Sequence, residues 1–245
     1  LVMWLLKGHD QRHAQYLLRD AKSVAVDEEK GGQKSDTGAS YMHKVLSHSR
    51  RHWQRREVLR DIRFYVLLPV ILAPSFISTG LFFHQNQLAS DKGWPLLQWA
   101  GTFPALAVAS VVGAIVAGFV TDRIGAVRLL PYVLPPLGLA CFVLSQSDSI
   151  WIAWSFMALL GVTTGTLQTF FGAFWAEAYG TRHLGGIRAL ATALMVLSSA
   201  LSPVIMGLLI DAHVSMNVIA LACAAYCIFG TAVAVLSSRI YQKTL

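Results

Sequence analysis

Charged residues are scarce in this chain. Asp, Glu, Lys and Arg make up 13% of the 245 residues, whereas 55% are hydrophobic, and the mean hydropathy is +0.52. A water-soluble globule of this length could hardly bury so much apolar surface in one core. The composition therefore disfavours a soluble protein and indicates a membrane protein.

Motifs for chemistry are also missing. The chain has no Gly-x-Ser-x-Gly elbow, no His-Glu-x-x-His pair, no paired carboxylates in an apolar run and no Gly-x-x-x-x-Gly-Lys-Ser/Thr phosphate loop. Its three cysteines, Cys141, Cys223 and Cys227, lie in apolar runs without neighbouring histidines, which indicates packing residues. We therefore expect no enzyme, cofactor, metal site or disulfide framework, and a primary pump half is disfavoured unless a partner subunit supplies the nucleotide site.

Long apolar runs are what the chain has in abundance. Each is long enough to cross a bilayer as a helix at about 1.5 Å per residue. Turn or charge signals separate the runs, and membrane helices accept the prolines inside them. The sequence thus predicts an all-α, polytopic membrane helix bundle with six transmembrane helices, at about 64–88, 98–120, 129–147, 150–175, 187–210 and 216–238.

The flanking segments differ from these runs. Residues 1–6 are apolar but too short to cross a membrane, so we interpret them as the end of a truncated transmembrane helix. Residues 7–63 form a basic loop with a Gly/Ser/Asp/Lys-rich middle. Its second half is compatible with either a solvated connector or a helix on the membrane surface. Residues 239–245 form a short tail.

The distribution of positive charge predicts the orientation. Nineteen of the twenty Lys and Arg residues lie on one side of the predicted bundle, and Lys92 alone lies on the other. The positive-inside rule places the long loop, the loop at 122–128 and the C-terminus in the cytoplasm. The net charge of +7 is thereby explained by topology, and nucleic acid is not an expected partner. We expect a multi-pass protein of the cell (inner or plasma) membrane.

A short charged segment joins the second and third runs. It reads Gly118-x-x-x-Asp122-Arg123-x-Gly125-x-x-Arg128 and resembles the loop signature of the major facilitator superfamily of secondary transporters. The resemblance implies that the six runs are the C-terminal half, helices seven to twelve, and that the central cytoplasmic loop precedes them. It also implies a missing N-terminal six-helix half as a partner. Ala126 and Val127 stand where the family usually has basic residues, as expected of its weaker second copy of the signature.

The same segment is a candidate conformational latch formed by Gly118, Asp122, Arg123, Gly125 and Arg128. An anion just past the end of its helix is disfavoured by the helix dipole, so we expect Asp122 to bridge to a neighbouring helix start or arginine in one conformation. The two glycines would permit a close helix contact and a tight turn. The alternative is that the charges only fix topology and anchor at the headgroups.

Two stripes of polar and aromatic residues share helix faces by three- and four-residue spacing. The resemblance implies that the first and fourth helices of each half line the central cavity. The amides are candidates for hydrogen bonds to a solute, and the aromatic rings for an apolar wall or gate. Hydroxyl groups that bond to their own helix are the alternative. The substrate-path candidates are Ser78, Thr79, Phe82 and Gln85 on the first run and Thr164, Gln168, Phe171 and Trp175 on the fourth.

The expected function follows from the layout and the resemblance. We expect a transmembrane transporter that moves a small solute by alternating access, embedded in the lipid bilayer and working with a coupling ion. The candidate solute class is a small organic anion. No charged residue lies in the middle of a run, so recognition of the anion's charge would need the other half as well. A non-transporting membrane sensor or scaffold is the alternative.

Overall fold

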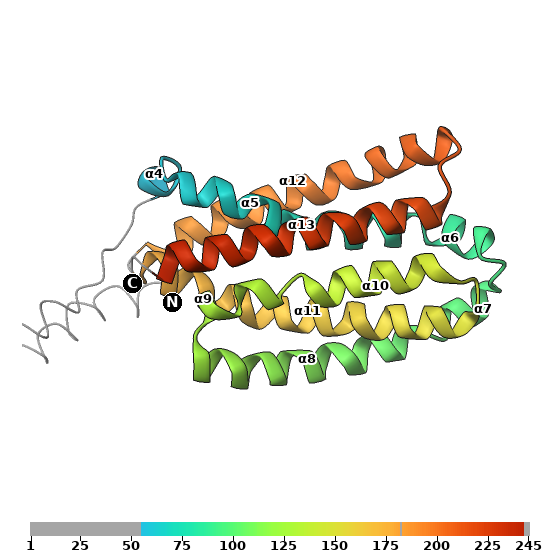
Figure 1. Ribbon diagram of the computed structural model, residues 1–245, viewed down its shortest axis with the longest axis horizontal. Coiled ribbons are helices and arrows are strands. Elements are labelled where there is room, and N and C mark those ends of the chain that lie inside the picture. Colours follow the sequence, from blue (N-terminus) through green and yellow to red (C-terminus); the bar gives the residue numbers. More distant parts are fainter. Residues whose placement is uncertain (1–54, 182, 243–245) are drawn as a thin grey trace, which may run out of the picture. The chain divides into compact units, whose positions relative to one another are not determined.

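The computed structural model describes residues 55–181 and 183–242, and within these ranges the chain is helical with no strand (Figure 1). The expected truncated helix at 1–6, residues 7–54 of the expected basic loop and residues 243–245 of the tail lie outside the described residues. The elements, in chain order, are α4 (Arg55–Val58), α5 (Ile62–Phe83), α6 (Gln85–Asp91), α7 (Leu96–Ala100), α8 (Phe103–Ile124), α9 (Ala126–Leu129), η1 (Leu130–Tyr132), α10 (Pro135–Gln146), α11 (Ile150–Tyr179), α12 (Leu184–Asp211) and α13 (Met216–Gln242).

The prediction of an all-α bundle with six transmembrane helices is confirmed. By length and composition, six helical segments of the described chain can cross a membrane. Two of them combine shorter elements, since the second contains α7 and α8 and the third contains α9, η1 and α10. The spans are Ile62–Phe83, Leu96–Ile124, Ala126–Gln146, Ile150–Tyr179, Leu184–Asp211 and Met216–Tyr241.

The third span is not one continuous α-helix. The sequence predicts a single helix over 129–147, whereas the structure has the short helix α9, a turn of 3-10 helix and then α10. Pro131 lies in the 3-10 turn, and Pro135 and Pro136 begin α10. Proline has no backbone N–H and restricts the residue before it, so the break falls where the prolines are clustered.

The helices pack in pairs. α8 lies along α11, α10 along α13, and α5 along α12, while α10 also contacts α11 and α13 also contacts α5. Glycines allow the close approach of α8 and α11. A Cβ atom at Gly165 would overlap the backbone carbonyl oxygen of Ser110, and a Cβ atom at Gly113 would lie 2.8 Å from the backbone carbonyl oxygen of Val162. Gly118 does not have this role. A Cβ atom there would meet only a methyl group of Thr169, at 4.0 Å.

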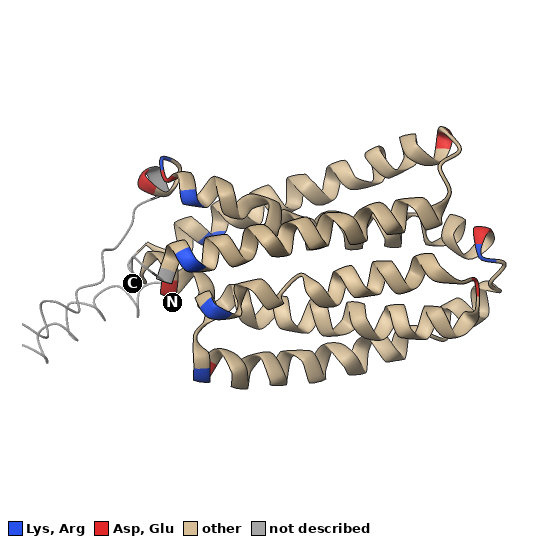
Figure 2. Cartoon of the chain, viewed as in Figure 1, with Lys and Arg blue, Asp and Glu red and all other residues tan. Residues whose placement is uncertain are grey.

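Charged side chains of the described residues gather at or near the two ends of the spans, with apolar residues between them (Figure 2). We call the end that carries residues 118–128 the motif end and the opposite end the Lys92 end. This separation is the one that a bilayer demands, because a charge at the middle of the hydrocarbon is costly.

Lys92 fastens two turns together at the Lys92 end. Its side chain is 1% exposed, and Nζ donates hydrogen bonds to the carbonyl oxygens of Leu144 (2.8 Å) and Ser147 (2.9 Å). Nζ also lies 2.9 Å from a carboxylate oxygen of Asp148, and Trp94 Nε1 donates to the carbonyl oxygen of the same residue. The ammonium group thus satisfies carbonyls at the C-terminal end of α10, where the helix dipole favours a cation.

Candidate functional site

The first predicted stripe lies on α5. Ser78 and Thr79 are half-buried, and neither hydroxyl belongs to the buried polar groups that lack a partner. Phe82 is also half-buried, and its ring packs against that of Phe103 at the start of α8, with 6.0 Å between the centroids. At the Lys92 end, therefore, Phe82 of this stripe packs against the second span.

Gln85 does not continue the α5 helix as the sequence spacing suggests. α5 ends at Phe83, His84 has φ −97° and ψ 24°, and Gln85 begins α6. The side-chain oxygen of Gln85 accepts a hydrogen bond from Trp99 Nε1 at 3.1 Å. This contact joins α6 to α7 at the Lys92 end, so Gln85 holds the two short helices together.

The second stripe, on α11, has an open part. Thr164 and Gln168 are exposed, although both lie well inside a 30-residue helix. The Thr164 hydroxyl donates to the carbonyl oxygen of Leu160 at 2.9 Å, the self-bonding pattern of hydroxyls in helices. Within the described ranges no hydrogen bond engages the Gln168 amide. Gln168 is therefore available to a ligand, to water or to another protein segment.

The other end of this stripe is buried. Trp175 is 2% exposed and stacks on Phe171 at 6.3 Å and on Tyr179 at 6.2 Å between ring centroids. It also meets Phe174 edge-on and approaches Phe64 of α5 at 6.4 Å. The spacing of the sequence places Trp175 with Gln168, whereas the structure places it in an aromatic cluster that joins α5 and α11 at the motif end.

The charged segment is more helical than the sequence indicates. Asp122 does not lie past the end of α8 but within its last turn, together with Arg123. Gly125 ends the helix with φ +86°, a left-handed conformation that favours glycine, and its N–H donates to the carbonyl oxygen of Thr121 at 2.9 Å. Asp122, Arg123 and Arg128 are exposed, and none of them has an ion pair within the described residues.

A carboxylate contacts the start of α9, and it comes from Glu177 of α11. Its Oε2 accepts a hydrogen bond, at 2.6 Å, from the backbone N–H of Ala126, the first residue of α9. A Cβ atom at Gly125 would lie 2.9 Å from Glu177 Oε1, so the absence of a side chain at Gly125 makes room for the carboxylate. A carboxylate at a helix N-terminus is favoured by the exposed N–H groups and by the dipole.

The sequence offered one signal for this contact. Glu177 is an acid at the end of an otherwise apolar run, and such residues usually have a partner. Its partner is a backbone group of another span, which no side-chain pattern reveals. For metal chemistry, no group of three or more His, Cys, Asp or Glu that could hold an ion occurs among the residues described.

Comparison with known proteins adds the family. No curated protein matches the chain. The sequence profile of the Major Facilitator Superfamily matches residues 2–187, a range that contains the first four spans and the segment from Gly118 to Arg128. Together with six apolar helices that can span a membrane, this match shows that the chain belongs to the Major Facilitator Superfamily and is an integral, multi-pass membrane transporter.

Proposed function

We propose that this chain is the C-terminal six-helix half of a secondary transporter that moves a small solute by alternating access. In this proposal residues 1–6 end the sixth helix, residues 7–63 form the basic cytoplasmic loop, residues 64–238 contain helices seven to twelve, and 239–245 form a cytoplasmic tail. The solute would bind between this half and an N-terminal half, and a coupling ion would supply the driving force.

The observation that carries the proposal is the exposed amide of Gln168. This residue lies about 5 Å from the midpoint of α11 at about 1.5 Å per residue, so it is deep in the membrane. An amide that faces lipid at this depth would lose its hydrogen bonds to water without replacement, at a cost of roughly 2–7 kcal/mol. Because Gln168 is exposed in this half, a water-filled path or a second half facing it would avoid that cost.

The burial of the helices supports a missing half. Only 11% of the most hydrophobic stretch of the second span and of the fifth span is buried, against 39–56% in the other four. Val112, Val116 and Phe119 of α8 and Val204 and Leu208 of α12 are each more than half exposed. These apolar surfaces fit helix packing against the N-terminal half, with lipid covering the remainder.

The charges support an orientation with the motif end in the cytoplasm of the cell (inner or plasma) membrane. Arg123, Arg128 and Arg239 lie at this end, whereas Lys92 at the other end is held by backbone carbonyls. No charged group of the described residues lies midway along a span. A small organic anion is the proposed solute class, with its charge recognised by the other half.

The motif end is proposed to act as a conformational latch. In the state described here Glu177 holds the start of α9, while Asp122 and Arg123 are exposed and able to meet the other half. Gly125 permits the turn between α8 and α9, and Arg128 is the third exposed charged residue of the proposed latch, with Asp122 and Arg123. If Asp122→Asn changes neither the transport rate nor the balance of inward- and outward-facing states, Asp122 has no part in a latch.

The proposal is tested with the full-length protein in proteoliposomes. Uptake of radiolabelled lactate, pyruvate, glucose and alanine is measured with and without an imposed pH gradient, and then repeated for Gln168→Leu. Gln146→Leu is the matched control, because Gln146 is exposed at the end of α10 and its side chain donates to its neighbour Ser145. We expect uptake of lactate or pyruvate that Gln168→Leu reduces and Gln146→Leu preserves.

Two results would count against the proposal. Equal uptake by both variants would remove Gln168 from the solute path. Absence of flux for every solute, by a protein that is folded and inserted, would favour the alternative of a membrane sensor or scaffold.

A further inference from the structure

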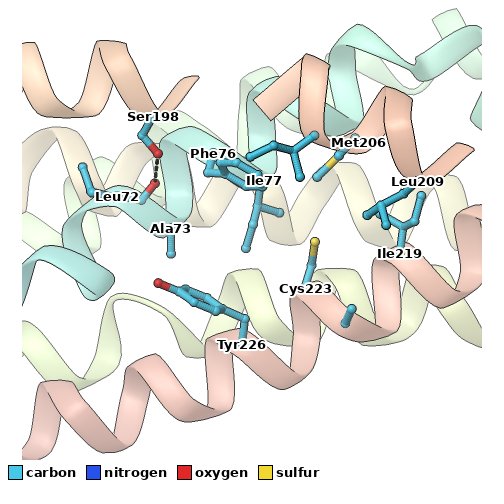
Figure 3. Close-up of a pocket in the computed structure, with 12 residues that line it drawn as sticks. Leu72, Ala73, Phe76, Ile77, Ser198, Met206, Leu209, Ile219, Cys223 and Tyr226 are labelled. Atoms are coloured by element: carbon cyan, nitrogen blue, oxygen red, sulfur yellow. Dashed lines mark hydrogen bonds between the residues drawn. The ribbon is translucent and has the colours of Figure 1, made fainter. Parts of the chain in front are cut away.

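A hollow lies between α5, α12 and α13 (Figure 3). α12 and α13 both pack along α5 but scarcely contact each other, so a gap remains between them with α5 as its floor. The cavity has a volume of about 400 Å³, which falls within the range of about 300–1,000 Å³ typical of small-ligand sites. We call it the α12–α13 groove.

The groove is distinct from the proposed solute path. On α5 its floor includes Ala73 and Ile77, which lie about 100–180° around the helix from Ser78 and Phe82 at about 100° per residue. Leu72 and Phe76 form the edge of the groove nearest to Thr79. On α12 the two surfaces are neighbours. Val204 and Leu208, on the apolar surface offered to the N-terminal half, do not line the groove, and Ile205 lies at the border between the two surfaces.

The chemistry of the walls excludes a polar occupant. Two hydroxyl groups line the groove, and both already donate to backbone carbonyls: Ser198 to Leu72 at 3.4 Å and Tyr226 to Pro69 at 3.2 Å. The remaining lining side chains are apolar apart from the thiol of Cys223, which points into the hollow (Figure 3). A polar ligand would find only two hydroxyl oxygens and one thiol as partners here, too few to replace its hydration.

The groove runs through one leaflet of a bilayer. Along α12 it extends from Ser198 to Leu209, a length of about 16 Å at about 1.5 Å per residue. Leu209 is two residues from the end of α12 at Asp211, so the groove begins near the Lys92 end. Half of a hydrocarbon core that is about 30 Å thick is about 15 Å. The groove therefore reaches from one membrane surface to the midplane.

Its volume is also too small to enclose a helix. A helix 16 Å long and about 10 Å in diameter would occupy on the order of 1,200 Å³, more than the roughly 900 Å³ of empty space between the walls and at the open mouth. Neither a helix of the N-terminal half nor one from a second copy can lie fully inside it. The occupant must be thin, apolar and about one leaflet long.

We propose that the α12–α13 groove binds one acyl chain of a phospholipid from the leaflet at the Lys92 end. The headgroup lies beyond the turn between α12 and α13, and the chain descends along Leu209, Cys223 and Met206 towards the midplane. A chain seated there packs against the back of α5, the helix that carries the first candidate stripe. Bound lipid therefore supports the position of α5.

The test uses the full-length protein in phosphatidylcholine vesicles that contain a trace of phosphatidylcholine with a photoreactive diazirine at the middle of one acyl chain. After illumination, mass spectrometry maps the adducts. We expect adducts on Met206, Cys223 and Tyr226 in excess of those on Ile228 and Phe229, which are exposed on α13 outside the groove. The excess distinguishes a seated chain from lipid that merely surrounds the protein.

A pair of substitutions makes the test specific. Ala222 lines the groove from α13, and Ala222→Phe is expected to fill it and lower the groove adducts by about tenfold, or about 1.4 kcal/mol of binding free energy. Ala232 is exposed on the same helix outside the groove, so Ala232→Phe should change nothing. Ala222→Leu and Ala232→Leu repeat the comparison if a phenylalanine prevents folding.

The proposal is overturned by either of two results. One is an adduct yield in the groove no higher than on Ile228 and Phe229, including no groove adduct at all. The other is a groove yield that Ala222→Phe leaves unaltered.

Discussion

Replacing Lys92 with methionine should strongly destabilise the bundle. Methionine keeps the apolar stem of the lysine and removes only the ammonium group. The carbonyl oxygens of Leu144 and Ser147 would then lose their donor. Both lie at the C-terminal end of α10, where no intrahelical N–H can replace it.

The magnitude follows from these two carbonyls. A buried acceptor that loses its partner costs about 1–3 kcal/mol. The contact to Leu144 is buried and that to Ser147 is partly buried, so Lys92→Met should lower the free energy of unfolding by about 1–3 kcal/mol through Leu144 and by less through Ser147. The ion pair with Asp148 adds little, because that carboxylate is 63% exposed and exposed pairs contribute about 0–1 kcal/mol. The loss thus comes mainly from the backbone contacts of the ammonium group.

The assay is unfolding of the purified full-length protein in detergent micelles, by denaturant titration and by heating. Asp148→Asn is the matched control, since it removes the charge partner but leaves Lys92 and its two carbonyl contacts in place. We expect a loss below about 1 kcal/mol for the control. Equal stability of Lys92→Met and Asp148→Asn would refute the view that Lys92 joins the two turns through the end of α10.

Three further substitutions test the packing by the same unfolding assay. Gly165→Ala should lower the free energy of unfolding by about 1–3 kcal/mol because its Cβ atom would overlap α8. Gly172→Ala is the control, since it has room for the added methyl. Equal effects of the two substitutions would contradict the close approach of α8 and α11. Trp175→Ala should lower the free energy of unfolding by about 3–5 kcal/mol. Trp151→Ala removes a ring that is 74% exposed and should lower it by less than about 0.5 kcal/mol. Similar losses for the two variants would argue against the aromatic cluster. Glu177→Ala removes the acceptor of the α9 N–H, so a loss of about 1.5–3 kcal/mol is expected, and an unchanged midpoint would show that this contact does not stabilise the turn.

Parts of the candidate site could be predicted from the sequence and parts could not. Helical spacing correctly indicates which residues share a face, but it does not say what packs against that face. Gln168 and Trp175 are seven residues apart on α11, yet one is exposed and the other buried. The difference arises because Phe64 of α5 contacts Trp175, whereas none of the described helices covers Gln168.

The charged segment shows the same limit. The sequence correctly predicts a turn at Gly125, because a glycine between two apolar helices can adopt a positive φ. Its prediction that Asp122 forms a bridge in one conformation stays a prediction, and it does not indicate the observed acceptor at the start of α9, Glu177, which is 51 residues from Ala126 along the chain. Backbone donors carry no sequence signature, so only the arrangement of α9 and α11 could reveal the pair.

Composition and the spacing of apolar runs by themselves determined the class of this protein, its six spans and the side on which its positive charge gathers. They suffice because a bilayer requires every span to satisfy its own backbone hydrogen bonds and to be apolar over a fixed length, which are local properties of the chain. Tertiary structure alone decided the roles of Lys92, Glu177 and Trp175 and the shape of the α12–α13 groove. These depend on which helices approach one another and how closely, and that approach is set by contacts between residues far apart in the sequence.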